Sequence, residues 1–243
     1  MKKLLWFQSA YFRNSKLKIA VGYHMKPLQV LAFFILSTIT TFGQDQWRNI
    51  YTQNAWKERD QWQQADGIIA KLKLKEGDNV GDVGCHEGYM TMKLTKVVGK
   101  AGKVYAVDVQ QNRLDKLNAI IKEEGISNVT TVKGDYDNPH LPLNTLDGAI
   151  IIDTYHEMDD HDDMLRHIKA ALKPGGRLII CEPIASNRRN LSRAEQERRH
   201  ELGMNYALED LQKAGFKVVF KKDPYIDREK IKGDKMWLIV AEK

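Results

Sequence analysis

Cysteine is scarce in this chain of 243 residues, which contains only Cys85 and Cys181. Two cysteines cannot form the disulfide framework of a small secreted domain, so an ordinary apolar core must hold the fold together. The content of 42% hydrophobic residues is sufficient for such a core. Internal repeats and low-complexity tracts are also absent from the sequence, so a repeat architecture is not expected.

Acidic residues are missing from residues 1–44, which carry six lysines and arginines. The whole chain has 38 basic and 32 acidic side chains, so residues 45–243 carry 32 of each sign and no net charge. The excess of positive charge therefore belongs to the N-terminal leader. A balanced remainder gives no general electrostatic case for binding nucleic acid, and we expect none.

A long hydrophobic run is missing as well. The apolar stretch within residues 25–44, "MKPLQVLAFFILSTITTFGQ", is about ten residues long, whereas a membrane-spanning helix needs roughly 20. A basic start, a short apolar run and small polar residues are typical of a secretory signal peptide, with cleavage near Gly43 or Gln44. We therefore expect residues 1–44 to be a leader and the protein to be exported to the periplasm, with membrane contact only through the leader. Cytoplasmic or membrane-tethered locations are the alternatives, and Met25 is an alternative start.

Strand and helix patterns alternate after a polar, tryptophan-rich segment at residues 45–72, which we expect to be helical in pieces. Apolar strand patterns occur at residues 79–84, 102–109, 128–135, 147–155, 176–184, 217–222 and 235–243. Helical patterns follow the first, second, fourth and fifth of them. This alternation predicts one α/β domain over residues 73–243, a doubly wound and mostly parallel sheet with helices on both faces. Ligands of such sheets bind beyond the carboxyl ends of the strands.

The turn after the first strand, "VGDVGCHEGYM" (residues 80–90), resembles a nucleotide-binding turn with its middle glycine replaced. Gly84 suits a sharp turn, and Gly88 suits close approach of a ligand to a helix start. A dinucleotide fingerprint needs glycines where this chain has His86 and Tyr89. An NAD site is therefore disfavoured, and an ordinary turn between a strand and a helix is the alternative.

Three carboxylates end three successive strands, namely Asp82, Asp108 and Asp135. Asp108 stands where an acidic side chain accepts hydrogen bonds from ribose hydroxyls, and Asp135 can accept one from an adenine amino group. Each aspartate alone is also explained as a turn residue or helix cap. Together they favour a ligand with a ribose, an adenine and positive charge, and they disfavour a pyrophosphate.

With these residues the sequence resembles the class I S-adenosylmethionine-dependent methyltransferases. The matching segments, in the order of that family, are "VGDVGCHEGY", "VYAVDV", "VKGDYDNPHLP", "LDGAIIIDTYHEM", "LKPGGRLIICEPI" and "AGFKVV…MWLIVAEK". Residues 51–69 also look like the N-terminal segment of a small bacterial branch with unassigned substrates. The resemblance implies a seven-stranded sheet of order 3-2-1-4-5-7-6 and S-adenosylmethionine as the cofactor.

The resemblance also implies roles for single residues. Asp82, Gly84 and Gly88 surround the amino-acid end of the cofactor, while Asp108 binds the ribose and Asp135 the adenine. Asp153, at the end of the fourth strand, lies near the methionine moiety and the substrate. His86 departs from the glycine usual in the family, which places a side chain in the turn. The implied strand order sets Cys85 and Cys181 about 10 Å apart, beyond the reach of a disulfide, so both should be free.

Methyl transfer depends mainly on alignment of nucleophile, methyl group and sulfur, and a base is needed only for a protonated nucleophile. The stretch "DTYHEM" supplies candidates at the end of the fourth strand. We expect His156 to be the general base, with Tyr155 beside it. The alternative for His156 is packing against the cofactor or capping the next helix.

The acidic stretch "HEMDDHDD" (residues 156–163) contains His156 and His161 among carboxylates. Capping and the helix dipole explain acidic residues in a first helical turn, so we expect no metal site here. The basic stretch at residues 187–200 either faces an anionic substrate or forms a solvated helix surface.

The sequence thus predicts an S-adenosylmethionine-dependent methyltransferase that acts on an unidentified small molecule. The alternative on the same fold is a protein that binds S-adenosylmethionine or S-adenosylhomocysteine without catalysis. Neither the methyl acceptor nor the oligomeric state follows from the sequence.

Overall fold

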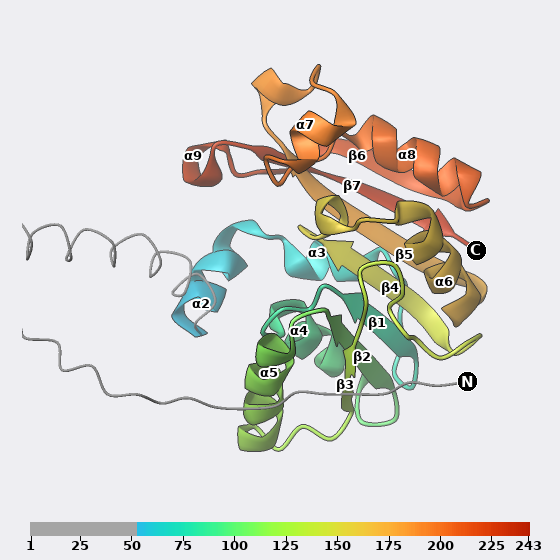
Figure 1. Cartoon of the computed structure of the whole chain (residues 1–243). Helices are drawn as coiled ribbons and strands as arrows, with labels where there is room; N and C mark the ends of the chain where they lie inside the picture. The colour runs from blue at the N-terminus through green and yellow to red at the C-terminus, as the bar shows by residue number, and fades with distance from the viewer. Residues whose placement is uncertain (1–52) are drawn as a thin grey trace, which may run out of the picture. The chain divides into compact units, whose positions relative to one another are not determined.

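Seven strands form one sheet in the computed structural model, which describes residues 53–243. Their order is β3-β2-β1-β4-β5-β7-β6, as expected from the resemblance (Figure 1). β1 to β5 are parallel, and β7 is antiparallel to both β5 and β6. The strands are β1 Asn79–Val83, β2 Lys103–Asp108, β3 Val129–Lys133, β4 Leu146–Ile152, β5 Leu172–Ile184, β6 Lys217–Asp227 and β7 Lys235–Glu242.

Helices cover both faces of this sheet (Figure 1). One face packs against α3, α4 and α5, and the other against α6 and α8. The helices are α2 Gln53–Trp62, α3 Ala65–Ala70, α4 Tyr89–Val98, α5 Gln111–Glu123, α6 His161–Ala171, α7 Arg193–Glu197, α8 Met204–Lys213 and α9 Glu229–Lys232, with 3-10 turns η2 Tyr155–Glu157 and η3 Ser186–Arg188. The doubly wound architecture predicted from the alternating patterns is confirmed.

β4 lies between the two apolar layers and contributes to both. Ala149 and Ile151 pack toward α6, whereas Ile150 and Ile152 pack toward α4. All four side chains are buried because a central parallel strand is covered on both faces. This explains the nearly continuous apolar sequence of the strand and fixes the direction in which its carboxyl end projects.

Local signals set the bounds of α6 as the sequence predicts. Asp160 caps the helix, and its carboxylate accepts a hydrogen bond of 2.9 Å from the backbone N–H of Asp163. The helix ends at Ala171, ahead of Pro174, whose ring cannot continue it. α6 thereby returns the chain to the amino end of the sheet, where β5 begins.

The sheet edge is longer than the sequence indicates. β6 was expected at residues 217–222 but extends to Asp227. Its pairing with β7 is interrupted after Lys222 by a register shift and resumes with Ile226 opposite Met236. The interruption accommodates Pro224, which has no N–H to donate to a neighbouring strand. The extension carries the chain to α9, beside the carboxyl ends of the central strands.

Both cysteines are free and buried, as expected. Cys85 follows β1 and Cys181 lies in β5, and β4 pairs with both of these strands. A whole strand therefore separates the two thiols.

The predicted leader, residues 1–44, and the first part of the segment at 45–72 lie outside the described residues. The described part of that segment contains α2 and α3. Among the helices of residues 53–243, none is both long and apolar enough to cross a bilayer.

Candidate functional site

The turn between β1 and α4 has three residues in the left-handed region, at alternate positions. The φ angles are +78° at Gly84, +52° at His86 and +96° at Gly88. A side chain on Gly84 would come within 2.2 Å of Thr154, and one on Gly88 within 2.4 Å of Leu117. His86 thus keeps the backbone conformation of the glycine it replaces, and the turn retains its shape. Such a conformation costs an L-residue roughly 1–2 kcal/mol.

The His86 side chain offsets part of that cost through one hydrogen bond, because its Nδ1 accepts the backbone N–H of Glu87 over 2.8 Å. The backbone N–H of His86 donates to Oδ2 of Asp108 over 2.9 Å. The other oxygen of Asp108 accepts the backbone N–H of Gln110 over 2.8 Å. Two backbone amides therefore fix the Asp108 carboxylate, and each of its oxygens keeps a lone pair for a ligand hydroxyl.

The His86 ring is neutral near pH 7. Burial, followed by the nearby cations Arg113, Arg59 and Lys116, lowers its pKa to about 3. Glu87 beside it is buried and accepts hydrogen bonds from Arg113 over 2.8 Å and from Lys116 over 2.6 Å. The histidine therefore adds no positive charge to the turn, and α5 is tied to the turn by two ion pairs.

Asp82 is a buried carboxylate at the end of β1. Its Oδ2 accepts a hydrogen bond of 2.6 Å from the hydroxyl of Thr91 on α4. Burial raises the pKa of Asp82 to about 6, although the Thr91 hydrogen bond and Arg59 favour the ionised form. A cation placed next to Asp82 would stabilise the carboxylate, so this position suits the positively charged part of a ligand.

α2 supplies a cation that the sequence did not single out. The Arg59 guanidinium lies 4.5 Å from the centre of the Tyr89 ring, and its charge acts on both Asp82 and Asp153. The Tyr89 hydroxyl in turn donates to Asp60 of the same helix over 2.9 Å. α2 is thereby attached to the start of α4, directly over the turn.

Asp135, expected to bind adenine, follows β3 in an exposed loop. Its side chain is 64% exposed and lies 2.7 Å from Nε2 of His140. The preceding residue, Gly134, is bonded through its N–H to the carbonyl of Asp108 over 3.1 Å. Asp135 therefore lies near Asp108, but its exposed side chain is fixed only weakly by the protein.

Asp153, directly after β4, has a left-handed backbone with φ +57°. Its carboxylate pairs with the buried Arg228 over 3.1 Å. Burial would raise its pKa, but the positive charges of Arg228, then His156 and Arg59, lower it below its usual value. Asp153 is therefore ionised and joins the end of β4 to the chain between β6 and α9.

Tyr155 does not face the site. Its side chain is completely buried, and its hydroxyl donates to Asp210 of α8 over 2.8 Å. Burial and the negative charge of Asp210 raise its pKa far above the usual value. The catalytic role expected for Tyr155 does not fit this position, because a side chain within an apolar layer cannot touch a substrate.

His156 lies between two carboxylates. Its Nδ1 is 2.5 Å from Oε2 of Glu182, and its Nε2 is 3.2 Å from Oε1 of Glu157. Burial alone would lower its pKa, but Glu182 and Glu157 raise it to about 10. With both ring nitrogens engaged in this way, His156 is not placed to act as the free general base that the sequence suggested.

Glu182 organises the end of β4 from the neighbouring strand β5. It is fully buried, and its Oε1 accepts the backbone N–H groups of Thr154 and Tyr155 over 2.7 and 2.9 Å. A charged residue inside the apolar run of β5 was the sequence signal for it. Arg228 had no comparable signal, because it reaches Asp153 from 75 residues away.

Three of the expected cofactor residues share one edge of the sheet: Asp82, Asp108 and Asp153 end the adjacent strands β1, β2 and β4. α2 and α9 both lie at the left end of the sheet in Figure 1. The Trp62 ring of α2 is 5.3 Å from Arg228 and 5.5 Å from Lys232 of α9. Asp135 lies at the periphery of this edge, and the side chain of Tyr155 lies outside it.

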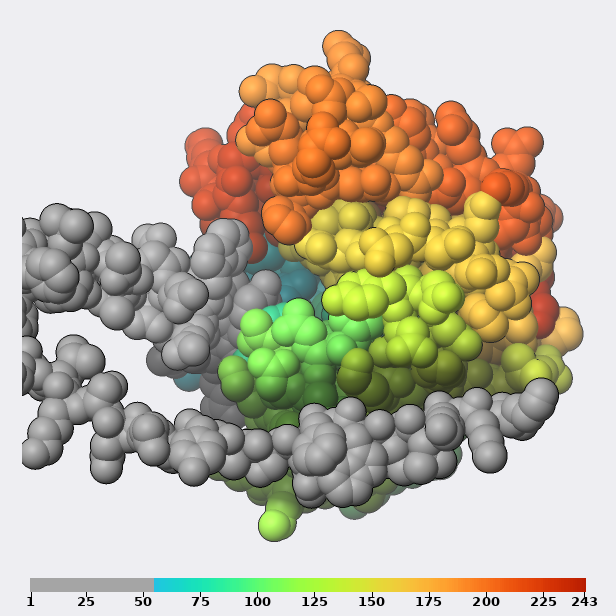
Figure 2. Space-filling view, in the orientation of Figure 1, coloured from blue at the N-terminus to red at the C-terminus, as the bar shows by residue number. Residues whose placement is uncertain are grey.

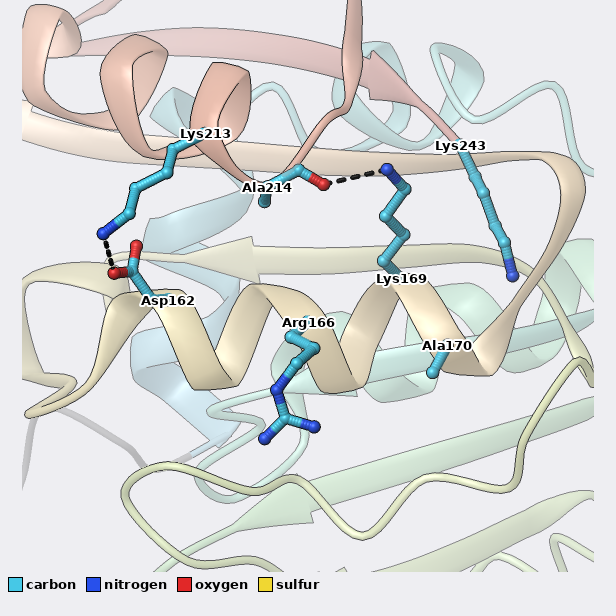
Figure 3. Close-up of a pocket in the computed structure, with 7 residues that line it drawn as sticks. All are labelled: Asp162, Arg166, Lys169, Ala170, Lys213, Ala214 and Lys243. Carbon is cyan, nitrogen blue, oxygen red and sulfur yellow. Dashed lines mark hydrogen bonds and ion pairs between the residues drawn. The ribbon is translucent and has the colours of Figure 1, made fainter.

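A basic groove between α6 and α8 is separate from this edge (Figure 3). Its volume is about 530 Å³, and Arg166, Lys169, Lys213 and Lys243 contribute its positive charges. Lys169 donates to the carbonyls of Ala214 and Gly215, and the other three cations also have protein partners. The arginines at 188, 189 and 193 are likewise paired with carboxylates, so these three side chains of the basic stretch at 187–200 stabilise the fold.

Residues 80–176 match a protein family described as "Methyltransferase domain". This range contains the turn after β1 and the ends of β2, β3 and β4. The structure is also similar to that of a SAM-dependent methyltransferase from Aquifex aeolicus, with 25% identity and a TM-score of 0.62 over 73% of this chain and 88% of the other.

Two curated relatives give finer names. A demethylmenaquinone methyltransferase of Lactobacillus johnsonii is 31% identical over 143 residues, which is 57% of this chain and 55% of the relative. A ubiquinone/menaquinone biosynthesis C-methyltransferase of Escherichia coli is 32% identical over 110 residues, 45% of this chain and 44% of the relative. The chain thus spans about half the length of the curated relatives it matches.

Proposed function

Since the chain belongs to the class I S-adenosylmethionine-dependent methyltransferases, we propose that it methylates a ring carbon of a small, quinol-like acceptor. The names of the two curated relatives support this acceptor class, one as a demethylmenaquinone methyltransferase and the other as a C-methyltransferase. The family match, residues 80–176, does not contain Trp62, Arg228 or Lys232, so the structural support for the acceptor class has to come from those residues.

The residues at the carboxyl edge fit S-adenosylmethionine by charge. Asp82 and Asp108 are carboxylates beside a turn that offers no net positive charge, and Arg59 lies above them. Asp108 would bind the ribose hydroxyls, Asp82 the cationic amino-acid end, and Arg59 the carboxylate of that end. When bound, the cofactor supplies a methyl group activated by its sulfonium. The residues of the chain align the methyl group with the acceptor, and α2 covers the site.

The observation that carries the proposed acceptor is an aromatic ring flanked by cations next to Asp153. Trp62 lies 5.3 Å from the Arg228 guanidinium and 5.5 Å from the Lys232 ammonium. An aromatic face can stack on a ring acceptor, and adjacent cations stabilise an ionised ring hydroxyl. Ionising that hydroxyl raises the electron density of the ring carbon beside it, which would take the methyl group and then lose its own hydrogen as a proton to water, restoring the aromatic ring.

Lys232 is the residue that we propose to take the hydroxyl proton. Desolvation and the neighbouring Arg228 and Arg59 lower its pKa from the usual value, so its Nζ releases a proton more readily than that of an ordinary lysine and can exchange one with the acceptor hydroxyl. Lys232→Met should lower kcat with little change in the affinity for the cofactor. Lys230→Met removes an exposed lysine of the same helix, and it should transfer methyl groups at the wild-type rate.

The test of the proposal is transfer of labelled methyl groups from S-adenosylmethionine to a short-chain naphthoquinol, a catechol and a primary amine, with the product atom assigned by NMR. Carbon methylation of the quinol supports the proposal. Methylation only on oxygen or nitrogen would overturn the acceptor class. Binding of S-adenosylmethionine by calorimetry with no transfer to any acceptor would favour the binding-protein alternative.

We also propose that residues 1–44 direct export to the periplasm, which rests on their basic start and short apolar run. Sequencing the N-terminus of the protein isolated from periplasmic and membrane fractions tests it. A mature start near Gln44 supports cleavage, whereas a start at Met1 or Met25 contradicts it.

A further inference from the structure

Two histidines and a glutamate meet just beyond the end of β4, beginning three residues after Asp153. Nε2 of His156, a carboxylate oxygen of Glu157 and a ring nitrogen of His200 all lie within 4.8 Å of one another. His156 and Glu157 belong to η2, and His200 comes from the segment after α7. The segment that contains α7 (orange) meets the one that follows β4 (yellow) on the face seen in Figure 2.

The spacing suits direct coordination. Nε2 of His156 and Oε1 of Glu157 are 3.2 Å apart. Bonds of about 2.0–2.2 Å to a tetrahedral zinc ion place two ligand atoms about 3.3 Å apart. Nδ1 of His200 is 2.5 Å from the same glutamate oxygen and would move outward by less than an ångström. The His200 side chain is 73% exposed and contacts the His156 ring at its edge, so there is room on its solvent side for that movement.

Glu182 contacts His156 on the side of the ring opposite Glu157. Its Oε2 lies 2.5 Å from Nδ1 of His156, the nitrogen that faces away from Glu157. A carboxylate on the rear nitrogen of a ligating histidine fixes the ring orientation and strengthens the ligand, and it is a regular feature of histidine metal sites. His156 is buried at 3% exposure and Glu182 at 0%, so this pair is rigid.

We propose that His156, Glu157 and His200 bind one divalent first-row transition-metal ion of the zinc type. Two imidazoles and one carboxylate select such ions over magnesium and calcium, which prefer oxygen ligands. Three protein ligands leave at least one position open, as in sites that bind water or a substrate oxygen. The exposed glutamate and histidine place that open position toward solvent.

The stretch at 156–163 suggested His156 and His161 as the pair for a metal, and capping explained its carboxylates. The structure separates those two histidines by function. Nε2 of His161 is 2.9 Å from the Tyr155 carbonyl, and Asp160 caps α6. The second imidazole of the cluster is His200, 44 positions after His156, which no local spacing could indicate.

The site is tested on the tag-free full chain, dialysed against a chelator and titrated with Zn²⁺ by calorimetry and with Co²⁺ by visible absorption. We expect one equivalent of Zn²⁺ to bind and Co²⁺ to give the absorption bands of a low-coordinate N/O site. Mg²⁺ should not compete. The measurement contains no methyl acceptor, so its result is independent of the proposed reaction.

His200→Ala should weaken Zn²⁺ binding at least tenfold and abolish the cobalt bands. His167→Ala removes a histidine from α6, outside the cluster, and should leave both unchanged. Glu182→Gln should weaken binding 10- to 100-fold through the orientation of His156. His200→Ala should retain the wild-type affinity for S-adenosylhomocysteine, which shows that it is folded. Absence of stoichiometric binding, or wild-type binding by His200→Ala, would overturn the proposal.

Discussion

The carboxyl edge of the sheet has two halves that are built differently. In the half at β1 and β2, backbone amides of the adjoining turns hold the key carboxylate, Asp108. In the half at β4 and β5, side chains far apart in sequence hold one another, as in the pair Asp153–Arg228 and the pair His156–Glu182. The first half is local in sequence and the second is assembled by the tertiary fold.

The match to the methyltransferase domain covers residues 80–176, which contain Asp82 and Asp108 of the first half and Asp153 and His156 of the second. Glu182 and Arg228, the partners that hold Asp153 and His156 in place, lie beyond it. We propose that the first half binds the cofactor and that Glu182 and Arg228 help to shape the acceptor side. The two halves should therefore be separable by mutation.

Asp108→Ala should have the largest effect on the first half. It removes a carboxylate that two ribose hydroxyls would share, so S-adenosylhomocysteine should bind about 1,000-fold more weakly, from two bonds of about 2 kcal/mol each. Calorimetry measures the affinity, and zinc binding should be unaffected. Asp115→Asn, an exposed aspartate of α5, is the matched control. A tenfold change or less would contradict the ribose role.

Glu182→Gln should have the largest effect on the second half. The substitution removes the buried one of the two carboxylates beside His156 and weakens two backbone hydrogen bonds, so the free energy of unfolding should fall by about 3 kcal/mol. Denaturant unfolding measures it, with Glu195→Gln on the surface as the control. Affinity for S-adenosylhomocysteine should change less than twofold, and a large loss would show that the two halves are not separable.

Arg59→Met should weaken cofactor binding about 30-fold, because a charge-assisted hydrogen bond to a carboxylate contributes about 2 kcal/mol. The affinity for adenosine, which has no carboxylate, should stay the same. Lys57→Met on the same helix controls for the loss of positive charge. Equal losses for both ligands would mean that Arg59 only supports the fold of α2.

Asp82 predicts a pH dependence of opposite sign for binding and for stability. Its pKa is about 6 in the free protein, and a bound cation favours the ionised form, so affinity for S-adenosylmethionine should rise about tenfold from pH 5 to pH 7 and then level off. A raised pKa stabilises the unliganded fold below about pH 4, and that contribution is lost as the pH rises through 6. Calorimetry and denaturant unfolding across this range measure the two slopes. Asp82→Asn should remove the pH dependence of both the affinity and the stability. If the variant keeps that pH dependence, another group causes it.

Asp135→Ala should have the smallest effect, about threefold on cofactor affinity, because an exposed hydrogen bond contributes under 1 kcal/mol. Adenosine and inosine should be compared, since inosine lacks the amino group. A preference for adenosine that Asp135→Ala abolishes would support the adenine contact. An unchanged preference would remove Asp135 from the site.

The sequence predicts the fold because its signals are local. Periodic apolar residues, a capped α6 and Pro174 define the elements, and the resemblance to a known family supplies their order. The end of β6 was missed because pairing resumes only after a register shift, which depends on β7 rather than on the residues of β6.

The candidate site divides in the same way. Asp82 and Asp108 could be found because each ends a strand, and strand ends meet at one edge. The direction of Tyr155 could not, because η2 rotates its side chain into the apolar layer and leaves His156 at the edge. Arg228 and His200 could not either, since only the packed fold brings them to residues far back in the chain.

The histidine in the turn after β1 has a consequence for the unfolded chain. A glycine at position 86 would be free of strain in the native turn but would leave the unfolded chain with more backbone freedom to lose. Histidine is strained in the native turn but loses less conformational entropy on folding, and the hydrogen bond that its ring accepts from the Glu87 N–H helps to order the turn before any ligand binds. The turn is therefore preorganised. A ligand that binds there need not order the loop, so less conformational entropy is lost on binding.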